Sequence, residues 1–158
     1  MAIDPTPAFP VEELVPHRGE MSLLDRILAY DADSLCAEVV IQPQSSFCGP
    51  DGVPGWVGIE YMAQAIAAWA GTAAKQEGTA VRVGFLLGSR RFSSSCSCFP
   101  VGARLHIQVE RLLQDSSGLG SFDCSIRFDQ EQQQARLNVF QPQDVSNFME
   151  SVKGQHNV

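Results

Sequence analysis

One carboxylate stands alone in a long apolar segment of this 158-residue chain. Between Asp51 and Lys75 the only formally charged residue is Glu60, and the segment opens with Pro54 and Gly55. A proline suits a helix start, because its missing N–H would have no intrahelical partner there. A helix that buries a carboxylate close to its N-terminus offers a proton donor together with backbone N–H groups for a developing negative charge. This combination suits acid–base chemistry on a carbonyl compound.

The segment that carries Glu60 has the composition of a helix. It contains no further proline and many alanines, which predicts one long helix at about 54–75. Its apolar residues lie on all sides, so the helix is either wrapped by the rest of the protein or spans a membrane. Glu60 and Gln64 within the run, and strand-forming sequence on both sides, argue against the membrane alternative. We therefore expect a buried central helix and no membrane span.

Alternating segments flank this helix. We expect a helical turn at 10–15, then strands at 21–30, 35–41, 81–92, 103–113, 121–128 and 135–140. Runs of antiparallel strands with a helix on one side make an α+β domain. A curled antiparallel sheet of about six strands around one apolar helix is the hotdog fold. We treat 1–158 as a single domain, with a loose arm at 1–9 and a tail at 141–158 that holds a short helix at 145–152.

Composition narrows the classes of function. A net charge of −7 argues against nucleic acid as a partner, because binding to phosphates needs a basic surface. Five cysteines without an export signal indicate reduced thiols and a cytoplasmic location. Cys96 and Cys98 are the only close pair, and the histidines (His17, His106 and His156) are scattered. We therefore expect neither a metal site nor a cofactor.

Two separated motifs resemble one family. Leu-Val-Pro-His-Arg at 14–18, followed by Asp-Arg-Ile at 25–27, is similar to the N-terminal signature of bacterial 3-hydroxyacyl-acyl-carrier-protein dehydratases of the FabZ and FabA kind. Pro-Gly at 54–55, with Glu60 and Ala-Gln at 63–64, resembles the start of their central helix. Phe92 and the turn at 99–102 also match, so the likeness extends from 14 to 140. Within the family the sequence looks most like a divergent branch found with aryl-polyene biosynthesis.

The resemblance implies dehydration of 3-hydroxyacyl thioesters carried on the phosphopantetheine of an acyl carrier protein. Glu60 would be the catalytic acid, and burial should raise the pKa of its carboxyl so that it holds a proton near neutrality. The N–H of Gly55 or Trp56 would bind the enolate-like oxygen. We also assign Gln64 and Asp51 to the binding of substrate.

The base is absent from the family's usual place. The family carries a catalytic histidine in the loop before the helix, and Ser46 stands at that position here. His17 matches the family's N-terminal histidine, and we consider it both as a catalytic residue and as a hydrogen-bonding anchor for the turn at Arg18. Active sites of this family form between two subunits. One hypothesis is therefore a heterodimer in which this chain supplies Glu60 and a His-bearing hotdog relative supplies the base; a homodimer is the alternative.

A carrier protein is acidic, so the enzyme needs a local basic surface. Arg90 and Arg91, with Arg82 or Arg104, could form this patch, or they could be ordinary solvated arginines. Two other functions remain open. In a hotdog thioesterase, Glu60 would activate water or attack the thioester. In a non-catalytic acyl-binding or scaffold subunit, the chain would stabilise an active relative.

Overall fold

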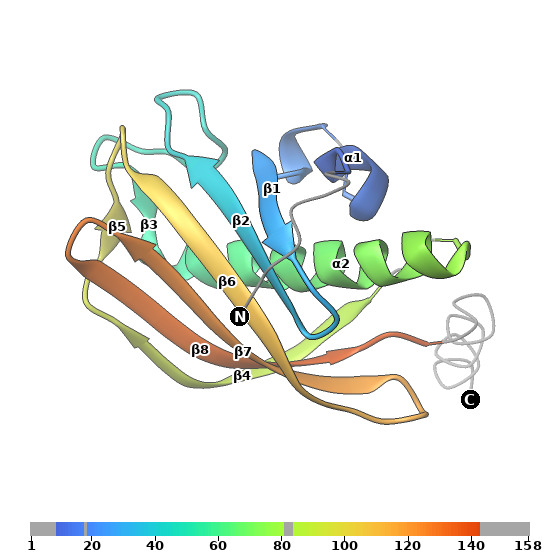
Figure 1. Cartoon of the computed structure of the whole chain (residues 1–158). Coiled ribbons are helices and arrows are strands. Elements are labelled where there is room, and N and C mark those ends of the chain that lie inside the picture. The colour runs from blue at the N-terminus through green and yellow to red at the C-terminus, as the bar shows by residue number, and fades with distance from the viewer. Residues whose placement is uncertain (1–8, 18, 81–83, 143–158) are drawn as a thin grey trace, which may run out of the picture.

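A six-stranded antiparallel sheet curls around one long helix in the computed structural model, which describes residues 9–17, 19–80 and 84–142 (Figure 1). The helix is α2 (Gly58–Glu77), and the strand order is β1-β2-β6-β7-β8-β4. The bounds are β1 (Arg26–Tyr30), β2 (Ser34–Val40), β4 (Phe85–Ser94), β6 (Arg104–Gln114), β7 (Leu119–Phe128) and β8 (Glu131–Phe140). This arrangement confirms the α+β class and the hotdog fold.

Strand alternation builds the core between sheet and helix. Leu105, Ile107 and Val109 on β6 are fully buried, while the polar residues between them face outward. On α2, Tyr61 and Trp69 are among the residues buried against this surface. The sheet does not enclose the helix completely, because a stripe of small residues (Ala63, Ala67 and Ala70) is only half-buried. Within the described part of the chain, no helix meets the length and hydropathy needed to cross a bilayer.

The start of the helix differs from the expected one. Pro54 belongs to β3 (Val53–Pro54), which pairs with β5 (Cys98–Phe99) in a small second sheet that the sequence analysis did not foresee. A 3-10 turn, η2 (Gly55–Val57), follows, and the α-helix begins only at Gly58. It ends at Gly78, whose φ of 71° gives the left-handed C-terminal cap that glycine favours.

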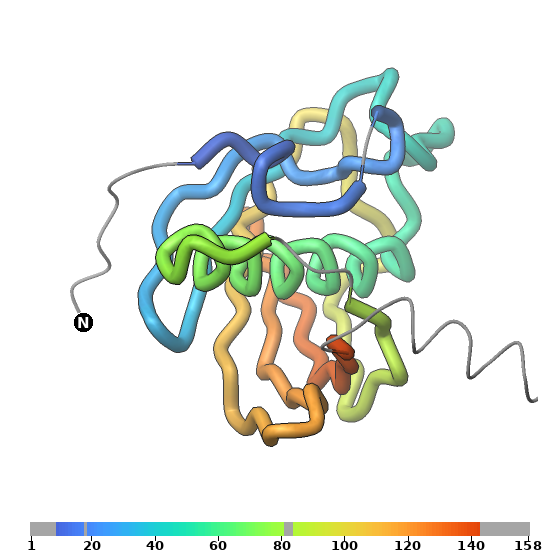
Figure 2. The backbone as a smooth tube through the Cα atoms, turned by 90° about the vertical axis from the view of Figure 1, so that its right-hand side faces the viewer, coloured from blue at the N-terminus to red at the C-terminus, as the bar shows by residue number. Residues whose placement is uncertain are grey.

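The N-terminal segment packs along α2. The short helix α1 (Val11–Leu14) matches the expected turn at 10–15, and the 3-10 turn η1 (Gly19–Met21) follows it. Figure 2 shows this segment on one side of α2, with β6, β7 and β8 on the other. The first strand begins at Arg26 and not at residue 21, because the Leu23 N–H donates to the side chain of Gln64 on α2 and not to a neighbouring strand.

Two further differences concern the C-terminal half. β8 begins at Glu131 and not at residue 135, because Asp129 adopts a φ of 50° and closes a two-residue hairpin turn. β4 runs to Ser94, two residues beyond its expected end. The arm at 1–8, residues 81–83 of the expected third strand, and the helix expected at 145–152 lie outside the described residues.

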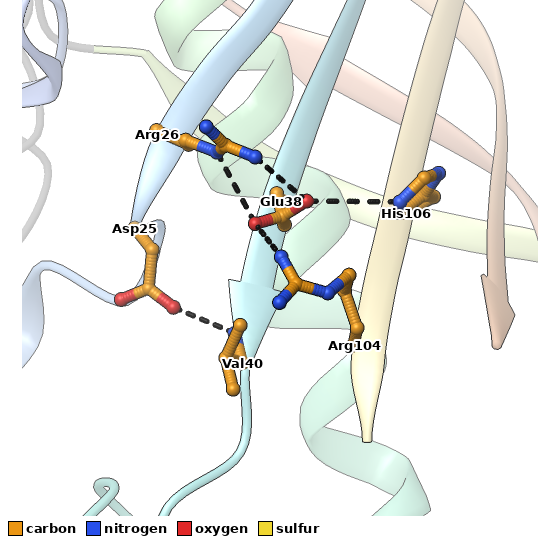
Figure 3. Close-up of polar contacts among 6 residues, drawn as sticks. All are labelled: Asp25, Arg26, Glu38, Val40, Arg104 and His106. Carbon is orange, nitrogen blue, oxygen red and sulfur yellow. Dashed lines mark hydrogen bonds and ion pairs between the residues drawn. The ribbon is translucent and has the colours of Figure 1, made fainter. Parts of the chain in front are cut away.

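A buried carboxylate on the outer face of the sheet ties three strands together. Glu38 on β2 is 5% exposed and accepts hydrogen bonds from Arg26 on β1 and Arg104 on β6, with His106 3.7 Å away (Figure 3). Burial by itself would raise the pKa of Glu38, but the hydrogen bond from Arg26 and the positive charge of Arg104 hold it below its ordinary value. The side chain of Asp25 extends the connection by accepting the N–H of Val40.

Candidate active site

A cleft of about 160 Å³ opens beside the half-buried stripe of α2. Its walls come from α2, from residues 84–86 at the start of β4, and from Phe122 and Val139 on the neighbouring strands. Apolar side chains dominate the lining. Among the described residues that line it, His17 and Glu60 are the only ionisable ones. An apolar groove with a few convergent polar groups is the usual form of a small-molecule site.

His17 and Glu60 come together at the end of the cleft nearest the start of α2. His17 follows α1, and Glu60 lies in the first turn of α2; His17 Nε2 is 3.8 Å from Glu60 Oε1. This distance is too long for a direct hydrogen bond, but it allows an ion pair with a protonated imidazole or a proton exchange through one water. The Glu60 side chain is 40% exposed, so the burial expected of it is not present in the single chain.

The side chain of Gln64, one turn further along α2, holds the carboxyl of Glu60. Its Nε2 donates to Glu60 Oε1 at 3.3 Å and to the carbonyl of Met21 at 2.7 Å, while its Oε1 accepts the Leu23 N–H at 2.8 Å. The side chain is fully buried. Because its amide is occupied by these contacts, we assign Gln64 to the positioning of Glu60, where the sequence had suggested a contact with substrate.

Of the two N–H groups expected to bind an oxyanion, one is already occupied. The Gly55 N–H donates to the carbonyl of Ser97 at 2.9 Å, which corrects its assignment as an oxyanion donor. The Trp56 N–H lies in the first turn, where a helix has no intrahelical acceptor for its N–H groups. The Trp56 side chain is 65% exposed and meets the ring of Phe47 edge-on, with centroids 5.7 Å apart. Trp56 is therefore the remaining candidate donor.

Two residues of the loop before the helix do not join this cleft within one chain. The Ser46 hydroxyl donates to the carbonyl of Glu20 at 2.8 Å, so it links the loop to η1. Asp51 is exposed in a hairpin closed by hydrogen bonds between Gly49 and Gly52, and it does not line the cleft. In the single chain, Asp51 therefore does not lie beside Glu60, where it was expected to contact substrate.

Arg90 and Arg91, the residues of the expected basic patch, line two different depressions. Arg90 and Arg91 are both exposed on the edge strand β4, but an irregularity there gives Arg91 a φ of 54°. Arg91 lines a polar depression of about 400 Å³ on the outer face of the sheet, whereas Arg90 lines a separate one. The guanidinium of Arg104 is paired with Glu38, and Arg82 lies outside the described residues.

Gln133 on β8 is not among the residues predicted from the sequence. Its side chain is 1% exposed, and its Nε2 donates to the carbonyl of Gly55 at the helix start. The strand pattern could have identified it. Gln133 alternates in step with Ala135 and Leu137, so all three side chains face the same side of β8, and Ala135 and Leu137 are buried in the core. A polar residue at an inward position of a strand needs a buried hydrogen-bond partner.

Comparisons with known proteins agree on one family. The model of ApeP-like proteins, the ApeP dehydratases, matches residues 9–150. A chain of the dehydratase heterocomplex ApeI:P from Xenorhabdus doucetiae is 33% identical, with 91% of this chain and 97% of that chain covered and a TM-score of 0.84. A search of the curated proteins finds no match.

More distant structures share the fold alone. A hypothetical thioesterase with coenzyme A from Streptococcus pneumoniae TIGR4 is 14% identical, with 77% of this chain and 89% of that chain covered and a TM-score of 0.59. The PaaI protein of the phenylacetic acid degradation operon of E. coli is also 14% identical, with coverages of 73% and 77% and a TM-score of 0.54.

Proposed function

The chain belongs to the ApeP-like dehydratase family, and from this premise we propose that it dehydrates 3-hydroxyacyl thioesters carried by the phosphopantetheine of an acyl carrier protein. The observation that supports this most directly is the His17–Glu60 pair at one end of an apolar cleft. The pair offers a base and an acid for the elimination, which requires no cofactor. The proposed role is in the biosynthesis of polyenes or fatty acids in the cytoplasm.

The two side chains divide the proton transfers. Neutral His17 accepts the proton from carbon 2 of the acyl group, and the electron pair of that bond forms the new double bond to carbon 3. The bond from carbon 3 to its hydroxyl breaks as protonated Glu60 donates a proton, and water leaves. The pair ends as imidazolium and carboxylate. Because Nε2 and Oε1 are 3.8 Å apart, a proton can return from His17 to Glu60 through one water and restore the starting state.

The rest of the site would hold the substrate. The Trp56 N–H stabilises the thioester oxygen as negative charge develops on it. The acyl chain lies along the small residues of α2, and the helix rise from Glu60 to Ala70 gives this path a length of about 15 Å. Trp69 and Phe122, with ring centroids 5.4 Å apart, also line the cleft.

A hotdog relative is the proposed partner. The related ApeI:P is a heterocomplex, and here the His17–Glu60 pair remains partly exposed in the single chain. Strand β4, at the edge of the sheet, carries exposed Leu86, Leu87 and Phe92. A partner seated there would cover the cleft, since residues 84–86 form part of its wall, and would exclude water from the reaction. The same arrangement allows the partner to supply a histidine, which is the second candidate for the base.

Matched variants test the assignment. We expect Glu60→Gln and His17→Gln each to lower kcat on a 3-hydroxyacyl carrier-protein substrate by about 10²–10⁴-fold, the usual contribution of a positioned acid or base. His106→Gln and Glu110→Gln, which are both exposed on the outer face of β6, are the controls and should keep wild-type kcat.

The assay should be run on the chain alone and on the chain co-purified with its partner. If His17→Gln retains full turnover while loss of a partner histidine abolishes it, the base comes from the partner. Release of free carrier thiol would indicate a thioesterase. Unchanged turnover of Glu60→Gln in the assembly would instead assign the chain to a non-catalytic subunit.

A further inference from the structure

The peptide bond between Gly55 and Trp56 is held in one orientation by buried contacts. Gln133 Nε2 donates to the Gly55 carbonyl at 2.9 Å, and the Gly55 N–H donates to the Ser97 carbonyl at 2.9 Å. Gln133 also lies 3.3 Å from Ser94 Oγ, which keeps its amide in place. The residue before the proposed oxyanion donor is therefore anchored to strand β8 and to the segment that leads into β5.

This anchoring determines where the Trp56 N–H points. A trans peptide places its N–H opposite its C=O. Because the Gly55 carbonyl points at the buried amide of Gln133, the Trp56 N–H of the same peptide points away from β8. A hydrogen bond accepted by the carbonyl also polarises the peptide and strengthens its N–H as a donor. The Gly55 carbonyl also accepts the Gly58 N–H within η2, so the turn and Gln133 together hold this peptide, and Gln133 adds a second donor that polarises it.

The helix start is shaped to admit this side chain. A Cβ atom on Gly58 would lie 1.7 Å from Gln133 Oε1, so any larger residue at position 58 would displace the amide. Within the described part of the chain, Gln133 Oε1 is buried and has no hydrogen-bond partner. A buried acceptor left unpaired is unfavourable, so packing alone does not explain a glutamine at this position.

Glu60 lies on the same face of the helix as this donor. Glu60 follows Trp56 by four residues, and residues four apart are neighbours on one face of a helix. We propose that Gln133 is a positioning residue, which holds the Trp56 N–H in the outward orientation that oxyanion binding requires. This inference rests on the proposed dehydratase function.

The kinetic test uses two independent ways of removing the contact. Gln133→Met keeps the volume but loses the donor, and Gly58→Ala displaces the amide while leaving Gln133 intact. We expect each to lower kcat about 10–100-fold with KM within about threefold, because losing a whole oxyanion donor costs about 10²–10³-fold and acts in the transition state. Gln134→Met, at the exposed neighbouring position, is the control and should keep wild-type kcat. Wild-type kcat in both Gln133→Met and Gly58→Ala would overturn the proposal.

A second readout does not depend on activity. The chain has two tryptophans, so ¹⁵N-tryptophan labelling of the full-length protein gives two backbone amide signals, assigned with Trp69→Phe. Gln133→Met should shift the Trp56 amide signal and raise its hydrogen-exchange rate, while the Trp69 signal stays in place. An unmoved Trp56 signal, or equal movement of both signals, would overturn the positioning role. If wild type shows no dehydration but the Trp56 signal moves alone, the positioning stands and the proposed function fails.

Discussion

At Gly71, α2 lies close to the backbone of the segment that leads to His17. A Cβ atom at this position would lie 2.3 Å from the carbonyl oxygen of Leu14 and 2.8 Å from its Cα. Both are backbone atoms, so no rotamer change can relieve the contact. Carbon–oxygen contacts normally measure about 3.3–3.6 Å, so Gly71→Ala must push the two segments apart by about 1 Å.

Two opposing terms determine the effect of Gly71→Ala on stability. Alanine in place of glycine within a helix gains about 1 kcal/mol from helix propensity. Overpacking costs about 1–3 kcal/mol, and we take the upper end because the clash is with backbone. The net loss of about 2 kcal/mol corresponds to a Tm about 4–8 °C lower for a chain of this size. Propensity alone predicts a higher Tm, so the sign of the shift discriminates between the two terms.

The same substitution should reach the active site. Leu14 lies three residues before His17, and a shift of about 1 Å in the position of a catalytic group can cost about 10²-fold in rate. Thermal unfolding followed by circular dichroism, together with kcat on the carrier-protein substrate, measures both effects. Gln76→Ala, at an exposed position of α2, is the control and should change neither. A Tm of Gly71→Ala at or above that of wild type would show that α1 and α2 are not packed rigidly against each other at this position.

Three further perturbations have defined outcomes. Because the pKa of Glu38 is lowered in the fold, its carboxylate stabilises the protein above the ordinary value of 4.5 and this stability is lost as pH falls through the folded value. The Tm difference between wild type and Glu38→Gln should therefore be full at neutral pH and shrink below 4.5. Gln64→Met leaves the Leu23 N–H unpaired, which costs about 1–3 kcal/mol, and it should lower kcat by releasing Glu60. Trp69→Ala should cost about 3–5 kcal/mol in unfolding free energy and shift kcat/KM toward bulkier acyl groups.

Each of these has a contrary result. If the Tm difference between wild type and Glu38→Gln does not vary with pH, the ion cluster in Figure 3 is not the source of that difference. Wild-type kcat in Gln64→Met would mean that Glu60 is positioned without it. An unchanged acyl preference in Trp69→Ala, measured over a series of chain lengths, would place the acyl group elsewhere.

Periodicity predicted most of the elements because the forces that shape them are local. The alternation of Leu105, Ile107 and Val109 with polar residues identified β6, since a strand turns successive side chains to opposite faces. The absence of proline and the abundance of alanine identified α2. One boundary that was wrong depends on a distant partner. The start of the first strand moved because the partner of the Leu23 N–H is Gln64, which lies on another element.

The sequence by itself determined the family, the central helix and Glu60 as the single charged residue between Asp51 and Lys75, because motif spacing and residue type are properties of the chain. Only the tertiary structure placed His17 beside Glu60, since α1 and α2 are far apart along the sequence and meet through packing at Gly71. It also paired the Gly55 N–H with the carbonyl of Ser97 and the Gly55 carbonyl with the side chain of Gln133, because hydrogen-bond partners on distant segments cannot be read from the local sequence.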